Sequence, residues 1–340
     1  MSVRRFFLDA SPGERRAVVT LDGRPERLIV ERDGEGGPCF GARYAARIRK
    51  IERGLGMAFL DLGGSEEAVM PAGRLAIQVG GAVEVEITAE ARRGKAAIAA
   101  YNGPAGREPG LVRPAPAAAE RLARLAAGQP IVEGEDARQA ADEAEEAALA
   151  IEHALPGGGS LAIEPTRALI AIDVDQGARG GGDQARAGRQ VNLAAIAEAA
   201  RVLRLKALGG LVVFDLVGRG QGGEALTAAA RKAFEPDQPG VAFGPVSKLG
   251  TFTLALPQRF TPTAERLLED DGLPSPRTAA QRVLRDLERE ASADPGALLQ
   301  AVCAPEVAME LRPLAEQLGP RFQVVEEVGR SRESADIRRR

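Results

Sequence analysis

The chain has 340 residues, too many for one small hydrophobic core, and this length predicts two to four domains. Its 45 Lys and Arg against 48 Asp and Glu give a formal net charge of −3, so nucleic-acid binding would have to come from local basic patches. Two cysteines far apart in the sequence exclude a disulfide framework and a four-cysteine zinc site, and a single histidine disfavours Ser–His chemistry. The charged N-terminus does not resemble a signal peptide and no apolar run reaches membrane-spanning length, so we expect a cytoplasmic protein.

The first hundred residues read as strands separated by turns. Residues 1–37 alternate apolar and polar side chains, with short strands predicted at 18–21 and 28–31. Residues 38–106 hold strand signals between Gly-rich turns, a spacing typical of a small OB-fold barrel. We place these strands at residues 42–52, 56–62, 68–70, 82–88 and 96–100.

The first predicted barrel strand is strongly basic. Its cations are Arg43, Arg47, Arg49, Lys50 and Arg53, and Lys95 lies on the turn before the last strand. With Tyr44 and Phe59 nearby, this pattern suits a groove that holds the backbone and stacks the bases of a single-stranded nucleic acid. The alternative is a solvated strand face with Phe59 in the core.

Residues 107–134 are rich in Pro, Ala and Gly and predict a linker. An acidic helix is expected from about residue 135 to 154. We interpret its acids as a solvated face, namely Asp136, Asp142, Glu143, Glu145, Glu146 and Glu152. Beyond residue 262, helices near 277–290 and 304–318 and a strand at 322–327 predict a small α/β domain with a frayed charged end.

Two apolar strand-like runs, residues 168–172 and 211–214, each end on an aspartate, Asp173 and Asp215. An amphipathic helix over 189–208 joins them, and strands joined in this way normally run parallel and adjacent. Two converging carboxylates repel each other unless a cation is present, and Mg²⁺ binds through one or two carboxylates plus substrate phosphates.

The surroundings of this pair extend the magnesium interpretation. Asp175 would point to the same side as Asp173 and support the ion directly or through water. The loop 179–189 supplies Arg179, Arg186 and Arg189 to face phosphate oxygens, and Lys248 lies on a later hairpin turn. The alternative is that these aspartates form turns or cap helices.

Gly218, Gly220 and Gly223 form a G-x-G-x-x-G between a strand and a helix, which permits a dinucleotide-binding interpretation. The following acids, Glu235 and Asp237, lie in a Pro-containing loop instead of at a strand tip. We therefore treat this motif as a turn and the nucleotide-dependent enzyme as the weaker hypothesis.

The runs IEPTRALIAIDVDQG, VNLAAIAEAARVLRLKALGGLVVFDLV and VSKLGTFTLALPQR resemble the catalytic core of the ribonuclease E/G family. GARYAARIRKIERGLGMAFLDLG and the following AVMP resemble that family's OB-fold RNA-binding barrel, and APEVAMELRPLAEQLG fits its C-terminal part. The resemblance covers most of the chain in the family's order.

The resemblance implies a multidomain α/β protein with an OB-fold barrel at 38–106 and a deoxyribonuclease-I-like catalytic domain at 135–262. Residues 1–37 would be a remnant of an RNase H-like domain, 107–134 a shortened linker, and 263–340 a small C-terminal α/β domain.

The implied activity is Mg²⁺-dependent endonucleolytic cleavage of single-stranded RNA by water that the metal activates. Asp173 and Asp215 match the family's metal-binding aspartates, and Asp175 stands where the family usually has Asn. Phe59 matches an RNA-holding aromatic of the barrel, whereas the next such aromatic is replaced by Val69. The RNA-binding residues that we expect are Phe59, Arg49, Lys50, Lys95, Arg179, Arg189 and Lys248.

Two departures from the family change what the resemblance implies. The segment that reads a 5′-monophosphate is missing, so we expect no 5′-end sensing. The Cys-Pro-x-Cys zinc link after residue 260 is missing, so we expect no zinc, and any homodimer must be held otherwise. The runner-up hypothesis is an RNA-binding member of the family with little or no catalytic activity.

Overall fold

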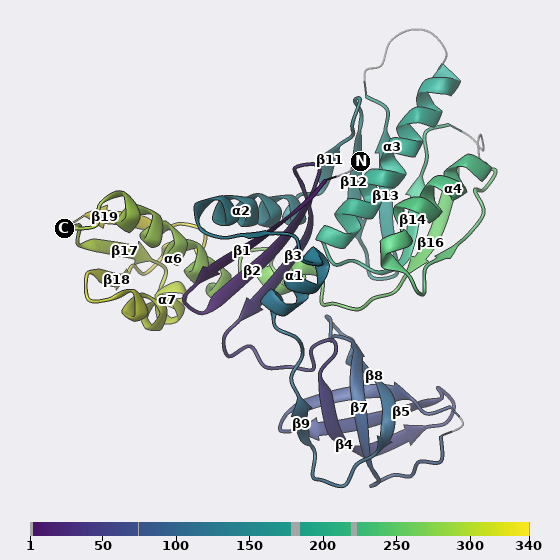
Figure 1. Ribbon diagram of the computed structural model, residues 1–340, viewed down its shortest axis with the longest axis horizontal. Helices are drawn as coiled ribbons and strands as arrows, with labels where there is room; N and C mark the ends of the chain where they lie inside the picture. The colour runs from purple at the N-terminus through teal and green to yellow at the C-terminus, as the bar shows by residue number, and fades with distance from the viewer. Residues whose placement is uncertain (1–2, 74, 178–183, 219–222, 340) are drawn as a thin grey trace.

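Figure 1 shows a computed structural model of the chain, which describes residues 3–73, 75–177, 184–218 and 223–339. The described residues form an N-terminal α/β unit, a β-barrel, a six-stranded sheet with two helices on one face, and a C-terminal α/β unit. No helix within the described ranges is long and apolar enough to cross a membrane.

The N-terminal sheet has the order β10-β1-β2-β3. Its elements are β1 (Arg4–Ser11), β2 (Glu14–Leu21), β3 (Arg24–Arg32) and β10 (Ile131–Val132), with helices α1 (Ala118–Ala126) and α2 (Glu135–Leu149). Neighbouring strand residues point to opposite faces, so Phe6 packs against α1 while Phe7 packs against α2.

Because α1, β10 and α2 follow the barrel in sequence but pack on strands that precede it, the barrel is inserted into this unit. The segment 107–134 is therefore largely ordered structure of the N-terminal unit and not a simple linker, since the small alanines of α1 and α2 pack closely on the sheet.

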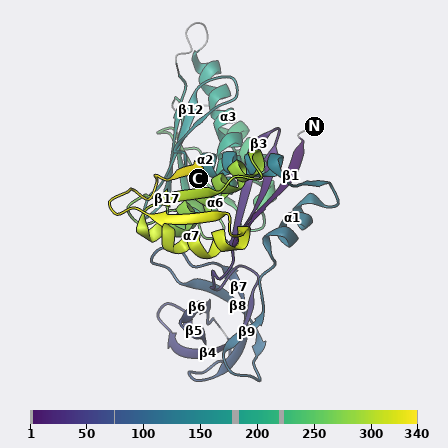
Figure 2. The same ribbon diagram turned by 90° about the vertical axis from the view of Figure 1, so that its left-hand side faces the viewer.

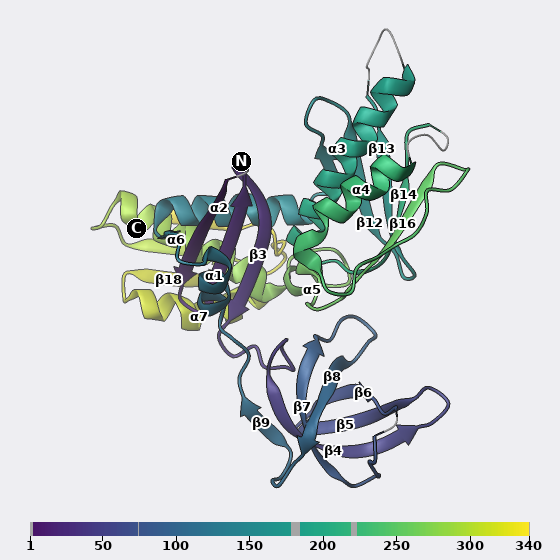
Figure 3. The same cartoon turned by 45° about the vertical axis from the view of Figure 1, so that its right-hand side comes forward.

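The prediction of a barrel is confirmed as a five-stranded OB-like barrel with the closed order β4-β5-β6-β8-β7-β4. Its strands are β4 (Arg43–Glu52), β5 (Met57–Gly63), β6 (Glu66–Pro71), β7 (Ala82–Ala89) and β8 (Ala97–Pro104), and β9 (Gly110–Arg113) adds to β4. Alternating inward residues such as Ile48, Leu60, Met70 and Val85 fill the interior. Figure 3 shows the barrel set apart below the N-terminal sheet and the six-stranded sheet.

The six-stranded sheet has the order β11-β12-β13-β14-β16-β15. Its strands are β11 (Glu152–Ala154), β12 (Ser160–Pro165), β13 (Ile170–Asp175), β14 (Gly210–Asp215), β15 (Ala242–Phe243) and β16 (Thr251–Leu256). Helices α3 (Gln184–Leu205) and α4 (Gly223–Ala233) cover one face, and the 3-10 turn η1 (Glu235–Asp237) follows α4. The β13–β14 pair is parallel, as the strand–helix–strand pattern predicts.

The C-terminal unit places two helices on a sheet of order β18-β17-β19 (Figure 2). Its elements are α6 (Pro276–Ala293), β17 (Leu299–Cys303), α7 (Pro305–Leu318), β18 (Phe322–Glu326) and β19 (Asp336–Arg339). The short helix α5 (Thr263–Leu267) precedes this unit and packs Leu267 into the core beneath α2. The charged end is not frayed as we expected, because β19 pairs antiparallel with β17.

One expectation about the acidic helix is wrong. Glu145 is buried and not solvated, because it accepts hydrogen bonds from Arg16 (3.2 Å), Arg282 (2.8 Å) and Arg285 (3.4 Å). These arginines come from β2 and α6, so this charge network joins the N-terminal and C-terminal units. The helix itself ends at Leu149, and residues 152–154 form β11 instead.

Candidate functional site

Asp173 on β13 and Asp215 on β14 are paired residues of the parallel ladder. Both are exposed on the same face of the sheet, while the alternate residues Ile172, Val174 and Phe214 are buried beneath α3 and α4. Neighbouring strands lie about 4.8 Å apart, which places the two carboxylates side by side. The sequence-based prediction that these two aspartates come together is thus confirmed by the geometry.

The residues that pair with the two aspartates on the neighbouring strands leave both carboxylates accessible. Ala162 pairs with Asp173 on one side, and Thr251 pairs with Asp215 on the other. Both neighbours are small, and neither carboxylate has a hydrogen bond or ion pair within the described residues. A ligand that approaches this face therefore meets two uncommitted carboxylates.

This donor set fits Mg²⁺ because the ion binds hard oxygen ligands and is commonly held by one or two carboxylates, with waters and phosphate oxygens completing its shell. No group of three or more His, Cys, Asp and Glu side chains suited to a metal occurs in the described part of the chain. The two aspartates would therefore be the principal protein ligands.

Asp175 lies two residues along β13 from Asp173, so both point to the same face. Its carboxylate already accepts a hydrogen bond from the backbone N–H of Gly177 (2.8 Å), which closes a tight turn after the strand. Gly159 lies against the backbone of Asp175 with φ +84°, and a side chain at residue 159 would collide there. Asp175 thus has a structural partner that Asp173 lacks.

Sequence reasoning missed Asn192, a buried residue of α3 that positions the end of β14. Its side-chain amide donates to the carbonyl oxygen of Val217 and accepts from the N–H of Val217, each at 3.0 Å. Gly188, one turn earlier, lets α3 approach the Val217 side chain closely. The available signal was an amide within the apolar face of the predicted helix.

Of the basic residues predicted to lie around the aspartates, two are exposed near this site and one lies outside the described residues. Lys248 is exposed on the turn whose Gly250 accepts a hydrogen bond from Leu216, next to Asp215. Arg189 is exposed on α3, next to Gly188, which packs against Val217. Arg179 lies outside the described residues.

Arg204, in the last turn of α3, and Lys206, just after that helix, are committed to the fold and are not presented to a ligand at the aspartates. Arg204 pairs with Glu26 and Asp237 at 2.9 Å each. Lys206 donates to the carbonyl oxygens of Ala148 and Ala150. Burial lowers the pKa of Lys206 to about 8.

The outer surface of the barrel carries an apolar strip of Phe59, Val69 and Ile98, which we call the barrel strip. These residues pair successively across β5, β6 and β8, and Phe59 and Ile98 are 38% and 39% exposed. Lys50 pairs with Phe59 and places its ammonium group 5.9 Å from the ring centroid. Phe59 therefore lies outside the core, beside a cation.

The barrel is less basic than the sequence suggests, because acids on neighbouring positions pair with its cations. Arg49 pairs with Asp61 (3.1 Å) and Glu67 (3.0 Å), and Lys50 pairs with Glu52 (2.6 Å). Arg43 and Arg47 pair in the same way with Glu86 and Glu108.

Of two further barrel residues that we expected near the RNA-binding surface, one is buried and one is exposed. Tyr44, which we placed near the stacking surface, is buried and donates to the carbonyl oxygen of Gly37 (3.2 Å). Lys95 is exposed on the turn before β8.

Comparisons with known proteins fall on the region that contains the aspartate pair. The Ribonuclease E/G family model matches residues 114–256. Ribonuclease E of Escherichia coli is 35% identical over 148 residues, which is 42% of this chain and 13% of that protein. Ribonuclease E of Haemophilus influenzae is 37% identical over 123 residues, covering 35% of this chain and 13% of the relative.

A chloroplastic ribonuclease E/G-like protein of Arabidopsis thaliana is 46% identical over 67 residues, which is 18% of this chain and 7% of that protein. The alignments therefore span a small part of each relative's length.

Proposed function

Because the chain belongs to the ribonuclease E/G family, we propose that it is an Mg²⁺-dependent endoribonuclease that cleaves single-stranded RNA. The observation that carries this proposal is the pair of uncommitted carboxylates, Asp173 and Asp215, on adjacent parallel strands within the family-matched region. Their repulsion favours a bound cation, and RNA phosphates are the substrate groups that would share it.

Asp173 and Asp215 would hold the ion, which when bound neutralises charge that develops on the phosphodiester. The small side chains of Ala162 and Thr251 leave space for the RNA backbone on this face. Lys248 and Arg189 would contact phosphates, and Asn192 would keep the end of β14 in place. We propose the same phosphate-binding role for Arg179 from the sequence alone.

RNA binding would extend onto the barrel. Phe59 would stack one base and the apolar side chains of the barrel strip would cover the next, with Lys50, Arg49 and Lys95 near the backbone. Since Arg49 and Lys50 already have acidic partners, we expect stacking to contribute more than charge.

We further propose domain identities that follow the family. Residues 38–106 would be an OB-fold, and the part of the predicted 135–262 range that follows α2, from β11 onward, would be a deoxyribonuclease-I-like nuclease domain. The N-terminal strands would belong to an RNase H-like unit completed by α1, β10 and α2, followed by the small C-terminal domain at 263–340. Without the 5′-sensor segment and zinc link, cleavage would be independent of the 5′ end and any homodimer free of zinc.

A second candidate function is RNA binding with little catalysis. It is favoured by the lack of a three-ligand metal cluster in the described residues and by the turn-forming role of Asp175. The two candidates share the barrel surface and differ in whether the aspartate pair cleaves RNA.

The deciding experiment is cleavage of an unstructured A/U-rich oligoribonucleotide with Mg²⁺, with and without EDTA. The Asp173→Asn/Asp215→Asn double variant should lose cleavage, and EDTA should abolish it in the wild type. Glu164→Gln, on the same exposed sheet face with no partner within the described residues, is the matched control and should retain activity. If wild type and double variant cleave at the same rate, the nuclease proposal fails and the binding candidate gains.

A further inference from the structure

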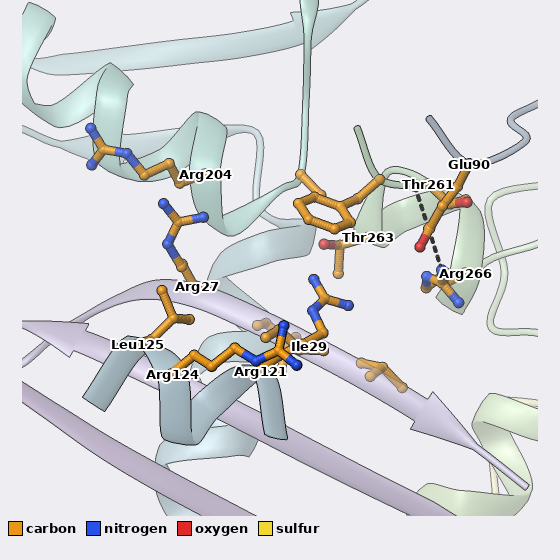
Figure 4. Close-up of a pocket in the computed structure, with 14 residues that line it drawn as sticks. Arg27, Ile29, Glu90, Arg121, Arg124, Leu125, Arg204, Thr261, Thr263 and Arg266 are labelled. Carbon is orange, nitrogen blue, oxygen red and sulfur yellow. Dashed lines mark hydrogen bonds and ion pairs between the residues drawn. The ribbon is translucent and has the colours of Figure 1, made fainter. Parts of the chain in front are cut away.

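A cavity of about 300 Å³ lies where the N-terminal sheet, the barrel, α3 and the segment before α5 meet. Figure 4 shows arginines from β3, α1 and α3 gathered around it. The charged side chains that line it are Arg27, Arg121, Arg124, Arg204, Arg266 and Glu90. Five cations and one acid give the lining a strong positive excess.

Two of these arginines are already neutralised. Arg204 is held by Glu26 and Asp237, and Arg266 pairs with Glu90 at 2.6 Å. The Glu90 carboxylate also accepts the backbone N–H groups of Phe40 and Thr261. Glu90 is therefore engaged by three donors, and its one salt bridge within the described residues is to Arg266.

Arg27 and Arg121 are left without a close anionic partner. Arg27 approaches a carboxylate oxygen of Asp237 at 3.9 Å, but Arg204 already donates to both oxygens of that group at 3.0 and 2.9 Å. Arg121 lies over the ring of Phe260, 4.4 Å from its centroid, and has no ion pair within the described residues.

The electrostatics of both guanidinium groups indicate a missing anion. Burial lowers the pKa of Arg27 and the neighbouring Arg204 lowers it further, whereas Asp237 and Glu26 oppose this shift without cancelling it. Burial also lowers the pKa of Arg121, which Arg266 and Arg27 reinforce against the opposing effect of Glu90. An anion between Arg27 and Arg121 would relieve this repulsion.

The rest of the lining favours an organic ligand over a bare ion. Leu28, Ile29, Leu125 and Ala207 form an apolar wall, and the volume is at the lower end of small-molecule sites. The hydroxyls of Thr261 and Thr263 donate to backbone carbonyls, so the free donors are those of the arginines.

We propose that this cavity binds the phosphate monoester of a nucleotide-sized organic molecule, with Arg27 and Arg121 as the phosphate ligands. Planar guanidinium groups match phosphate oxygens in a bidentate manner, and the dianion balances two arginines. The site lies beside Arg204, near the C-terminal end of α3, whereas the aspartates lie near the other end of that helix, so binding is separate from the proposed nuclease activity.

The test is isothermal titration calorimetry of the full chain with AMP, ribose 5-phosphate and adenosine. We expect the two phosphates to bind and adenosine not to bind. Arg121→Gln and Arg27→Gln should each weaken binding at least about tenfold, the usual effect of removing a charge-assisted hydrogen bond. Arg5→Gln is the matched control, because Arg5 also lies over a phenylalanine ring (Phe7, 5.2 Å) but outside the cavity.

The proposal is overturned if neither phosphate binds at about 1 mM, if adenosine binds as well as AMP, or if the Arg121→Gln and Arg27→Gln variants bind like wild type. Circular dichroism and the thermal midpoint of each variant separate lost binding from lost folding. Competition of AMP with 5′-phosphorylated and 5′-hydroxyl oligoribonucleotides identifies the source of the phosphate. If only the 5′-phosphorylated oligoribonucleotide displaces AMP, the natural ligand is the 5′ end of an RNA. If neither oligoribonucleotide displaces AMP, the natural ligand is a free small molecule.

Discussion

Asn192 on α3 and Val217, two residues beyond Asp215, hold each other through two hydrogen bonds of 3.0 Å. The amide satisfies both backbone groups of Val217 where the chain leaves the sheet. This contact fixes the end of β14 relative to the helix that connects it to β13. The proposed metal ligands therefore depend on a residue that touches neither of them.

Asn192→Leu should lower the free energy of unfolding by about 2 kcal/mol, because it leaves the N–H and C=O of Val217 without partners. RNA cleavage should lose kcat with little change in KM, since the barrel surface is untouched. Gln190→Leu, which removes an exposed amide from the same helix, is the control. An unchanged kcat in a destabilised Asn192→Leu protein would limit Asn192 to a structural role.

Asp175→Asn should cleave RNA within about threefold of wild type, because an Asn side-chain oxygen can accept the Gly177 N–H as Asp175 does. Asp173→Asn should instead cost at least about 100-fold, since a metal clamp supplies several kcal/mol of transition-state stabilisation. Single-turnover cleavage at saturating enzyme compares the two. Equal, large losses would make Asp175 a direct metal ligand.

Phe59→Ala should weaken RNA binding by about 1–3 kcal/mol, the usual contribution of one stacked base. Val69→Phe should strengthen binding, because residue 69 pairs with Phe59 on the same exposed face. Fluorescence anisotropy with a labelled oligoribonucleotide measures both. Leu111→Ala, an exposed residue of β9 outside the barrel strip, should have little effect; if it weakens binding as much as Phe59→Ala, stacking on the strip is wrong.

Much of the fold could be predicted because its signals are local. Period-2 alternation located the barrel strands, and the apolar face of residues 189–208 located α3. The insertion of the barrel could not be predicted, since it depends on α1 and α2 returning to strands more than 80 residues earlier. Fold-wide pairing of this kind has no local pattern.

The candidate site likewise has a part that could be predicted from the sequence and a part that could not. The aspartate pair follows from the parallel pairing of two strands joined by a helix, which brings the ends of β13 and β14 together. Whether a charged side chain is exposed or paired cannot be predicted from the local sequence. Arg189 and Arg204 lie on the same helix, yet Arg189 is exposed and Arg204 forms salt bridges with two acids. Partners distant in sequence decide that outcome, as Glu145 with Arg285 also shows.

Oligoribonucleotides with a 5′-monophosphate and a 5′-hydroxyl should be cleaved at similar rates, because the function that we propose includes no sensing of the 5′ end. Matched oligonucleotides differing only at the 5′ end measure the ratio of kcat/KM. A ratio above about ten, which corresponds to 1.4 kcal/mol, would refute independence from the 5′ end.

His153, the single histidine of the chain, should make folding stability fall as pH decreases from about 6.5 to 4. Burial lowers its pKa to about 4, and the positive charges of Lys206 and Arg201 reinforce burial, while Glu198 opposes it. In the unfolded chain His153 is therefore protonated as the pH falls below about 6.5, whereas in the folded protein it is protonated only near pH 4. The stability present above pH 6.5 decreases by about 3 kcal/mol over this window.

His153→Phe should remove that slope, since the aromatic ring is kept and the titrating group is lost. Urea unfolding at pH 7, 5.5 and 4.5 measures the slope in both proteins, and the imidazole resonances of the wild type report the pKa directly by NMR. The Glu side chains titrate at the acid end of this window, but both proteins carry the same carboxylates, so their contribution to the slope is common to both. A folded-state pKa near 6.5, or an equal slope in His153→Phe, would show that burial of His153 does not control acid stability.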